Sequence, residues 1–386
     1  MLGAALLAAG SYFWWSGRPE RHLDEAERCL AVGEFESIRP WLALPEATAR
    51  TRDRALLVRA RAALAQGRPA EAVRPLDEVD AGGLWAVDAA FWKGRTLQAV
   101  GQYGRAAEWF RSFVDRRPGD ADGHRWLAAA AYELGDHKTA LAELREVVRS
   151  VPKDARAWRT IALLLKEDNE PDEARSAYRT TLRLDPIQPD ARLELAEVLT
   201  TLGQYDEAER ELEVCSGRVP EGDRLDLLAR GLRARGDQDG FRTLIERAVV
   251  GHPRHVGLLH QRAQAEAAER RTAEAIAWLD RALAVDPHHA ASYYQRGLLK
   301  KALGDPDGAA RDLARSSELN ATLAEMSRLN DEAAAKPADA EVRVRIGGLC
   351  ERLGKAEMAA FWYRADLAID PNDASARAAT AALKPQ

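Results

Sequence analysis

The chain has 386 residues, a length that suggests two or three ordinary domains or one elongated array. Hydrophobic residues make up 46% and charged residues 30%, values that favour a buried core over a disordered chain. The 56 basic and 61 acidic side chains give a net charge of -5, which excludes the strongly basic footprint of a general nucleic-acid binder. The three cysteines lie far apart, so the sequence predicts neither a disulfide framework nor a cysteine metal pair.

An uncharged apolar run occupies residues 2–15, ends in Trp14 and Trp15, and is followed by two arginines. As a helix it would span roughly 21 Å, short of the ~30 Å hydrocarbon core of a bilayer. Its aromatic and basic end suits a membrane interface. We predict that residues 1–17 form a single N-terminal membrane anchor, with the rest of the chain on one side of the membrane. A secretory signal, which would make the protein secreted or periplasmic, and an apolar capping helix are the alternatives.

One position recurs about every 34 residues and is glycine in eight of its ten occurrences, which points to a turn. These positions are Gly33, Gly67, Gly101, Gly135, Asn169, Gly203, Gly236, Arg270, Gly304 and Gly354. A small residue stands seven places before each of them, and proline closes many of the units. Glycine tolerates a positive φ after a helix and proline stops the next helix, so each unit is predicted to be a helix hairpin. A hairpin alone cannot bury its apolar face, so the hairpins are expected to stack.

This pattern resembles the tetratricopeptide repeat. The fifth unit shows the family's small, aromatic and proline positions at Trp158, Ala162, Ala174, Tyr178 and Pro186. The resemblance implies an all-α, right-handed superhelical solenoid of stacked antiparallel helix hairpins, with about ten repeats over residues 19–373. The last two turn positions are separated by 16 extra residues, so an inserted helix is expected near residues 321–337. Residues 374–386 are expected to form a C-terminal capping helix and tail.

Motifs for catalysis were sought in the sequence, and it contains no GxSxG, HExxH or GxGxxG pattern. His252, His255 and His260 cluster, and His288 and His289 recur one repeat later. No carboxylate completes a metal-ligand set with them at helical spacing. We therefore predict no metal, no cofactor and no enzymatic activity.

By the geometry of the resembled family, the first helix of each hairpin lines the concave face of the superhelix. In the second to fifth units this face carries cations with aromatic side chains beside them. These groove candidates are Arg61, Phe91, Arg95, Arg125, Tyr132, Arg156, Arg159 and Lys166. Guanidinium groups bind carboxylates through two hydrogen bonds, so the groove candidates predict an acidic peptide segment as ligand. A solvated charged face, neutralised by neighbouring carboxylates, is the alternative.

The resemblance implies a non-catalytic protein–protein interaction scaffold or adaptor, bacterial and placed at a membrane, with proteins and not nucleic acid as partners. Two other functions stay open. One is a structural subunit that associates with itself, since the oligomeric state is not fixed by the sequence. The other is a bacterial envelope-assembly protein, because an anchor followed by repeats also resembles the lipopolysaccharide-assembly repeat proteins. Those end in a cysteine-paired metal module, which this chain lacks, having only Cys350 near its end.

Overall fold

The computed structural model describes residues 18–336 and 339–383, and gives the backbone alone for residues 331, 334, 335 and 368. The chain forms two compact units. Unit 1 holds the described residues of Met1–Glu146, Lys336–Glu341 and Tyr363–Gln386, and unit 2 holds Val147–Ala335 and Val342–Trp362. In the described ranges the regular structure is helical and no strand occurs. The predicted all-α fold is therefore confirmed.

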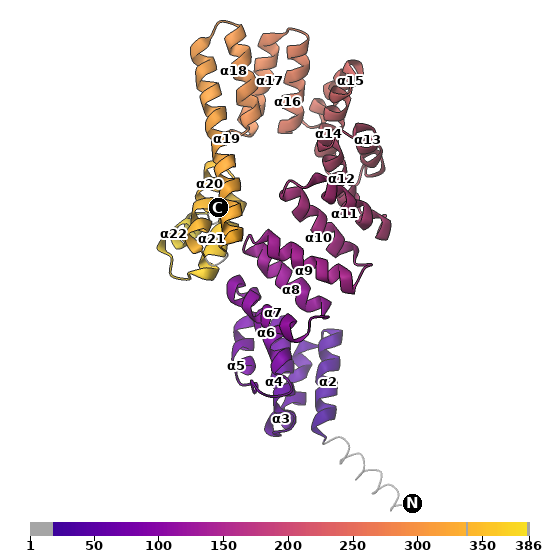
Figure 1. Cartoon of the computed structure of the whole chain (residues 1–386), viewed down its shortest axis with the longest axis vertical. Helices are drawn as coiled ribbons and strands as arrows, with labels where there is room; N and C mark the ends of the chain where they lie inside the picture. The colour runs from indigo at the N-terminus through magenta and orange to yellow at the C-terminus, as the bar shows by residue number, and fades with distance from the viewer. Residues whose placement is uncertain (1–17, 337–338, 384–386) are drawn as a thin grey trace, which may run out of the picture. The chain divides into compact units, whose positions relative to one another are not determined.

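From α2 to α8, the helices of unit 1 fold back on one another in chain order (Figure 1). Its helices are α2 (Pro19–Val32), the 3-10 helix η1 (Phe35–Ile38), α3 (Arg39–Ala47), α4 (Arg52–Ala65), α5 (Pro69–Asp77), α6 (Ala86–Ala99), α7 (Tyr103–Arg116), α8 (Ala121–Glu133), most of α9 (His137–Ser150), and α22 (Ala374–Ala382). The pairs α4–α5 and α6–α7 pack as hairpins, and α2, α4, α6 and α8 each contact the next helix of that series. The hairpins of unit 1 therefore stack through their first helices.

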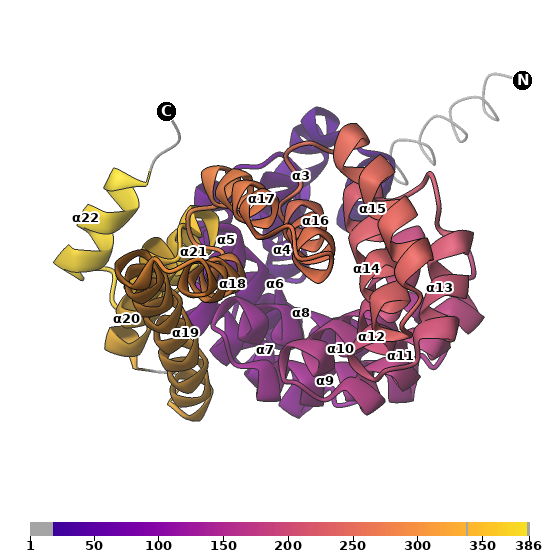
Figure 2. The same ribbon diagram turned by 90° about the horizontal axis from the view of Figure 1, so that it is seen from above.

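Unit 2 repeats the same arrangement. Its helices are α10 (Ala155–Glu167), α11 (Pro171–Leu184), α12 (Pro189–Thr201), α13 (Tyr205–Val214), α14 (Glu221–Ala234), α15 (Gln238–Gly251), α16 (Val256–Ala268), α17 (Thr272–Val285), α18 (Ala290–Ala302), α19 (Pro306–Ala335), most of α20 (Ala340–Arg352), and the first half of α21 (Ala356–Ile369), whose second half belongs to unit 1. Helices α16, α17, α18 and α19 lie side by side in chain order (Figures 1 and 2). The antiparallel hairpin array expected from the 34-residue period is present in both units.

The recurring turn positions have the backbone conformation that the sequence predicted. Nine glycines of the described chain have a positive φ, and eight of them are the turn glycines of the period. Asn169 and Arg270, which replace glycine at two of the turns, also have a positive φ, of 59° each. At the first turn, Gly33 donates its N–H to the carbonyl of Leu30, and Glu34 donates to Cys29. These bonds satisfy carbonyl groups at the helix end and reverse the chain.

Replacing Arg270 by glycine is expected to raise the free energy of unfolding by about 1 kcal/mol, because a side chain in the left-handed region is strained and glycine is not. Urea unfolding followed by circular dichroism measures the change. Arg270→Ala is the matched control, since it removes the guanidinium but keeps a Cβ at the same φ. A glycine variant no more stable than the alanine variant would contradict the expectation.

Small residues in mid-helix let the two helices of a hairpin approach closely. A Cβ built on Gly94 in α6 would lie 2.7 Å from the ring of Phe110 in α7, a distance that real Cβ atoms do not show. Phe110 is fully buried, as are Ala60 and Ala162 at the equivalent positions of other units. The recurring small residue is therefore a steric requirement of the hairpin.

The extra residues between the last two turn positions, near 321–337, do not form a separate helix. They continue α19, a single helix of 30 residues, because no glycine or proline occurs between 309 and 336. The second half of α19 packs against α20, where Cys350 Sγ lies 3.7 Å from Met326 Sδ and Arg352 donates to the Thr322 hydroxyl. The expected inserted helix is thus an extension of the helix before it.

The run expected to anchor the chain in a membrane, residues 2–15, lies outside the described residues. Among those that are described, no helix combines the length and the apolar character needed to cross a bilayer. A spanning helix needs about 20 apolar residues. The apolar run that prompted the prediction, residues 2–15, has 14. The membrane localisation predicted from the sequence is therefore not supported, and that prediction is corrected.

Candidate interaction site

The groove candidates all lie on first helices of hairpins, but they belong to two units and are described separately. Unit 1 holds Arg61 on α4, Phe91 and Arg95 on α6, and Arg125 and Tyr132 on α8. Unit 2 holds Arg156, Arg159 and Lys166, all on α10.

Two arginines and two tryptophans alternate along three successive first helices of unit 1. The guanidinium of Arg61 lies 5.2 Å from the ring centroid of Trp92 on α6. Arg95 lies 5.5 Å from the same centroid and 3.5 Å from the centroid of Trp126 on α8. Each such cation–π contact is worth roughly 0.5–2 kcal/mol, depending on its exposure. We call these four side chains the Arg–Trp ladder.

Arg95 is the central cation of the ladder. Burial lowers the pKa of its guanidinium, and the nearby Asp122 carboxylate opposes this effect only in part. Within residues 18–336 and 339–383, no hydrogen bond or ion pair joins Arg95 to a carboxylate. The two tryptophans therefore position this cation, while its hydrogen-bond donors are not used by a carboxylate of the described chain.

The two tryptophans are themselves fixed by the core. Trp92 packs against the buried cluster that includes Leu56 and Ala89, and Trp126 packs against the cluster around Phe110. The rings of Trp126 and Phe110 are stacked with centroids 6.4 Å apart. Each indole thus has part of its surface in the core and one face under an arginine. This support restricts the ladder to one geometry, which lowers the entropic cost of binding a ligand.

The other candidates of unit 1 are placed differently. Phe91 contacts the rings of the buried Phe110 and Phe113, at 5.9 and 5.1 Å between centroids, so it belongs to the core side of α6. Arg125 pairs with Asp122 on its own helix. Tyr132 stacks on His137, with centroids 5.7 Å apart. Of these three side chains, Phe91 also contacts the ladder, because its ring lies edge-on to the ring of Trp92 with centroids 5.3 Å apart.

In unit 2 two of the candidate cations bond the neighbouring first helix. Arg159 donates two hydrogen bonds to Glu194 of α12, of 3.1 and 2.7 Å, and these bonds raise its pKa although burial opposes the rise. Lys166 Nζ lies 2.8 Å from a carboxylate oxygen of Glu197. Arg156 is exposed, and its guanidinium has no hydrogen bond or ion pair with a described residue. Arg159 and Lys166 therefore act as ion pairs between consecutive repeats.

Two of the five histidines noted in the sequence, His260 and His289, meet at a serine in unit 2. The Nδ1 atoms of His260 and His289 lie 3.1 and 2.7 Å from the hydroxyl oxygen of Ser292. Burial lowers the pKa of His260 to about 4, and repulsion from His289 and Arg233 adds to the effect. No three His, Cys, Asp or Glu side chains of the described residues stand close enough to hold a metal ion. The arrangement is a neutral polar link between α16 and α18.

Comparisons with known proteins bear on the fold. Family models of the tetratricopeptide repeat match residues 92–155 and 165–235. A search of the curated proteins finds no match. Among solved structures, the chain is similar to a tetratricopeptide repeat protein from Parabacteroides merdae ATCC 43184, with a TM-score of 0.54, 18% identity, and coverage of 66% of this chain and 99% of that one.

Two further structures are similar at lower scores. One is YrrB, described as a TPR protein with an unusual peptide-binding site, with a TM-score of 0.33, 21% identity, and coverage of 46% of this chain and 91% of that one. The other is the APC/C hetero-tetramer Cut9-Hcn1, with a TM-score of 0.39, 13% identity, and coverage of 97% and 92%.

The stacked helix hairpins define this chain as a helical repeat protein. The recurring turn glycines and the small mid-helix residues are those of the tetratricopeptide repeat. Over residues 92–155 and 165–235 the chain consists of tetratricopeptide repeats. Proteins of this family are generally non-catalytic scaffolds for other proteins, so the fold supports a protein-interaction role. The absence of enzymatic activity stays a prediction.

Sequence reasoning missed Trp92 and Trp126 as members of the candidate site, because it considered only the charged side chains and two other aromatic residues of the first helices. A signal was present. Arg61 and Arg95 are 34 residues apart, and so are Trp92 and Trp126. Residues 34 apart occupy equivalent places in neighbouring repeats, so the two arginines, and likewise the two tryptophans, lie at equivalent places on neighbouring first helices.

Proposed function

We propose that the chain is an adaptor whose unit 1 binds an acidic segment of a partner protein on the Arg–Trp ladder. The observation that carries this proposal is Arg95, a partly buried cation between two tryptophan rings with no carboxylate bonded to it from the described residues. A carboxylate of the partner would take the donors of this guanidinium through two parallel hydrogen bonds. The ligand thus supplies the anion that Arg95 lacks.

The second cation of the ladder supports the same ligand. Arg61 and Arg95 both lie against the Trp92 ring, at 5.2 and 5.5 Å from its centroid. Two like charges around one ring repel each other, and an anion bound beside them relieves that repulsion. Among the described residues, the one ion pair of the Arg61 guanidinium is a distant contact with Glu27, at 4.0 Å. A segment with more than one acidic side chain is therefore favoured over a single carboxylate.

Tryptophan and arginine are also the residue types that most often dominate binding energy at protein interfaces. In the ladder both types are fixed by the packing of α4, α6 and α8, so little side-chain entropy remains to be lost. The self-associating subunit and the envelope-assembly protein named from the sequence stay alternatives, and no contact in either unit specifically favours them.

The test uses the full chain and a fluorescein-labelled hexaglutamate peptide, with binding followed by fluorescence anisotropy. We expect the chain to bind hexaglutamate but not hexaglutamine. Arg95→Gln is expected to weaken binding about tenfold, the loss of roughly one charged hydrogen bond. Arg159→Gln is the matched control, because its guanidinium is already bonded to Glu194. The proposal fails if Arg95→Gln binds like the unchanged chain, or if Arg159→Gln loses as much affinity.

A further inference from the structure

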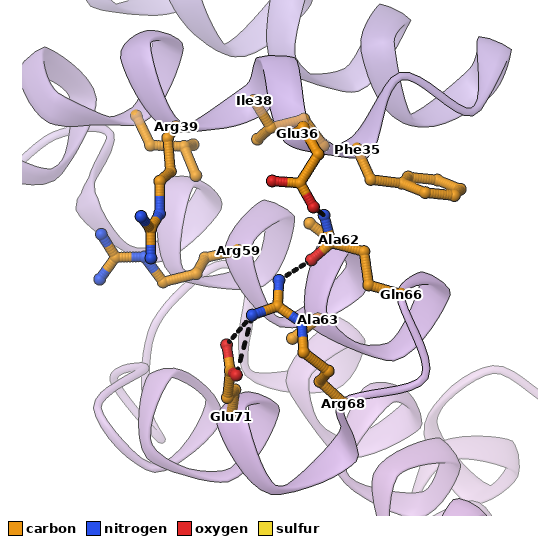
Figure 3. A pocket seen from close by; sticks show the side chains of 11 residues that line it. Phe35, Glu36, Ile38, Arg39, Arg59, Ala62, Ala63, Gln66, Arg68 and Glu71 are labelled. Atoms are coloured by element: carbon orange, nitrogen blue, oxygen red, sulfur yellow. Dashed lines mark hydrogen bonds and ion pairs between the residues drawn. The ribbon is translucent and has the colours of Figure 1, made fainter.

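Unit 1 also contains a cavity of about 460 Å³ that lies between η1, α3, α4 and the start of α5 (Figure 3). Small-molecule and side-chain sites in proteins have volumes of about 300–1,000 Å³, so the cavity is large enough to accept a ligand group. Its floor is apolar and consists of the buried side chains of Ile38, Leu42, Ala62 and Ala63.

The cavity has a clear cause in the sequence. In a regular repeat of this chain the second helix is long, as in α7 with 14 residues. In the first repeat Pro40 and Pro45 disturb it, and the 3-10 helix η1 and the nine-residue α3 take its place. The short side chains of Ala62 and Ala63 on α4 face this shortened element and do not fill the space beside it.

Charged side chains border the apolar floor. Figure 3 shows Arg39 and Arg59 on one side of the cavity, and Arg68 bonded to Glu71 on another. Arg59 pairs with Glu46 at 2.8 Å. The guanidinium of Arg39 has no hydrogen bond or ion pair with any residue of the described chain. The side formed by Arg39 and Arg59 therefore carries a positive charge that the chain does not fully neutralise.

The cavity is separate from the Arg–Trp ladder. Arg59 and Arg61 are both on α4, but they are two residues apart. In an α-helix, side chains at this spacing point in directions that differ by about 160° around the helix axis. A ligand in the cavity and a ligand on the ladder would thus contact different faces of α4.

We propose that this cavity docks a second partner segment, in which a leucine-sized apolar side chain directly neighbours an acidic residue. The apolar side chain lies on Ala62 and Ala63, where it removes apolar surface from water. The acidic side chain binds between Arg39 and Arg59, where the charge is complementary. Glu36 at the rim, which accepts one hydrogen bond from Gln66, has acceptor capacity left for a peptide N–H. A fatty acid offers no such donor, so the rim fits a peptide.

The probe is the dipeptide N-acetyl-leucyl-glutamate amide, whose only charge is the glutamate side chain. Binding to the full chain is followed by NMR of ¹³C-labelled alanine methyl groups. We expect saturable shifts of the Ala62 and Ala63 methyl signals. Two matched dipeptides, N-acetyl-leucyl-glutamine amide and N-acetyl-alanyl-glutamate amide, are expected to bind more weakly, since each lacks one of the two groups.

Arg39→Gln is expected to weaken binding of the probe about fivefold, the effect of losing one solvent-exposed charged contact. Arg210→Gln, an exposed arginine of α13, is the control and is expected to leave binding unchanged. Arg95→Gln is also expected to bind the dipeptide normally, which separates this proposal from the ladder. Shifts that do not saturate, equal binding of the glutamine dipeptide, or an unaffected Arg39→Gln variant would each overturn the proposal.

Discussion

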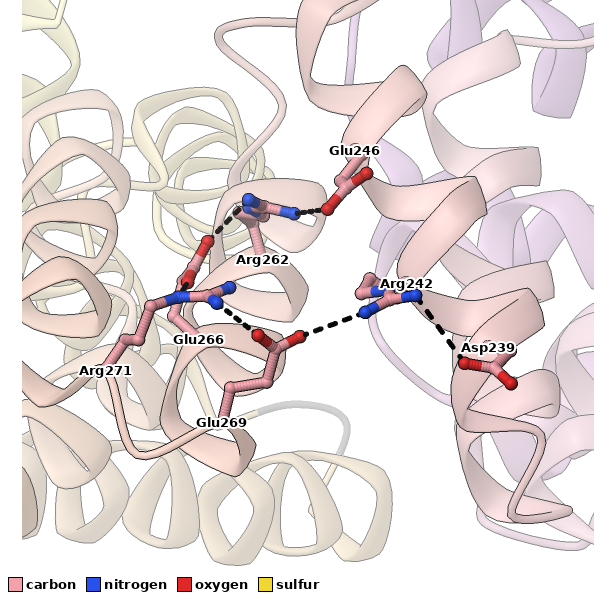
Figure 4. Close-up of polar contacts among 7 residues, drawn as sticks. All are labelled: Asp239, Arg242, Glu246, Arg262, Glu266, Glu269 and Arg271. Carbon is pink, nitrogen blue, oxygen red and sulfur yellow. Dashed lines mark hydrogen bonds and ion pairs between the residues drawn. The ribbon is translucent and has the colours of Figure 1, made fainter.

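Replacing Glu266 by glutamine is expected to lower the free energy of unfolding by about 3 kcal/mol, because a buried ion pair loses one partner while the other charges remain. Glu266 is on α16 and is only 3% exposed. Its carboxylate lies 2.5 Å from Arg262 and also contacts Arg271, which precedes α17 (Figure 4). Glutamine keeps the shape of the side chain but removes the negative charge that both arginines need.

The surrounding ion pairs are more exposed than this centre. Arg262 also pairs with Glu246 at 3.1 Å, and Arg271 also contacts Glu269. Glu269 in turn lies 3.8 Å from Arg242 of α15 (Figure 4). Water and salt screen such outer pairs, so each contributes little. The stability should therefore depend mainly on Glu266.

Urea unfolding followed by circular dichroism measures the difference. Glu269→Gln is the matched control, because it removes a carboxylate from the same Arg271 at a more exposed site, and it is expected to cost less than about 1 kcal/mol. Equal losses in the two variants would show that burial of Glu266 does not decide its contribution.

Lowering the pH from 7 to 5 is expected to reduce the stability of the chain by about 2 kcal/mol through His260 alone. Burial lowers the pKa of this imidazole to about 4, against 6.5 for an unperturbed histidine. At pH 5 the unfolded chain therefore binds a proton that the folded chain does not. The stabilisation is present above the unfolded pKa and is lost as the pH falls through the folded pKa.

The variant His260→Gln isolates this effect, because glutamine does not titrate. The difference in unfolding free energy between pH 7 and pH 5 should be smaller in the variant than in the unchanged chain. A difference that stays the same would mean that His260 is not neutral in the folded state at pH 5.

His124 in α8 gives a comparison of opposite sign. Burial lowers its pKa, but the hydrogen bonds to Glu143 and to the carbonyl of Pro118 outweigh burial, so the net shift is upward. Its stabilisation is present below the unfolded pKa and is lost as the pH rises through the folded pKa. The variant His124→Gln should therefore cost more stability at pH 5 than at pH 7.

The hairpins were predictable from sequence because one local requirement fixes each turn. Only glycine, or rarely another residue such as Asn169 or Arg270, adopts the positive φ that ends the first helix. Because every hairpin has this requirement at the same position, glycine recurs in the sequence at intervals of about 34 residues. The continuity of α19 was missed because the period alone says that residues are extra, and not that the helix before them continues.

The roles of the candidate cations were not predictable in the same way. Arg95 and Arg159 both lie on first helices, and the sequence predicted both as cations of the groove. Arg159 meets Glu194, which is 35 residues further along the chain, whereas Arg95 meets two tryptophan rings. The partner of each cation depends on the neighbouring repeat and on side-chain rotamers. The cavity beside Ala63 was hidden for the same reason, because it results from the packing of a shortened helix.

The long helix α19 also bears on how such an array can change its length during evolution. Insertions that are not whole repeats normally disrupt the stacking of a repeat protein. Here the added turns present buried side chains of their own, among them Leu329 and Ala333, so α20 packs on the extension. A few extra codons inside a second helix can therefore be inherited without the loss of the hairpin that follows, since the lengthened helix supplies the missing surface.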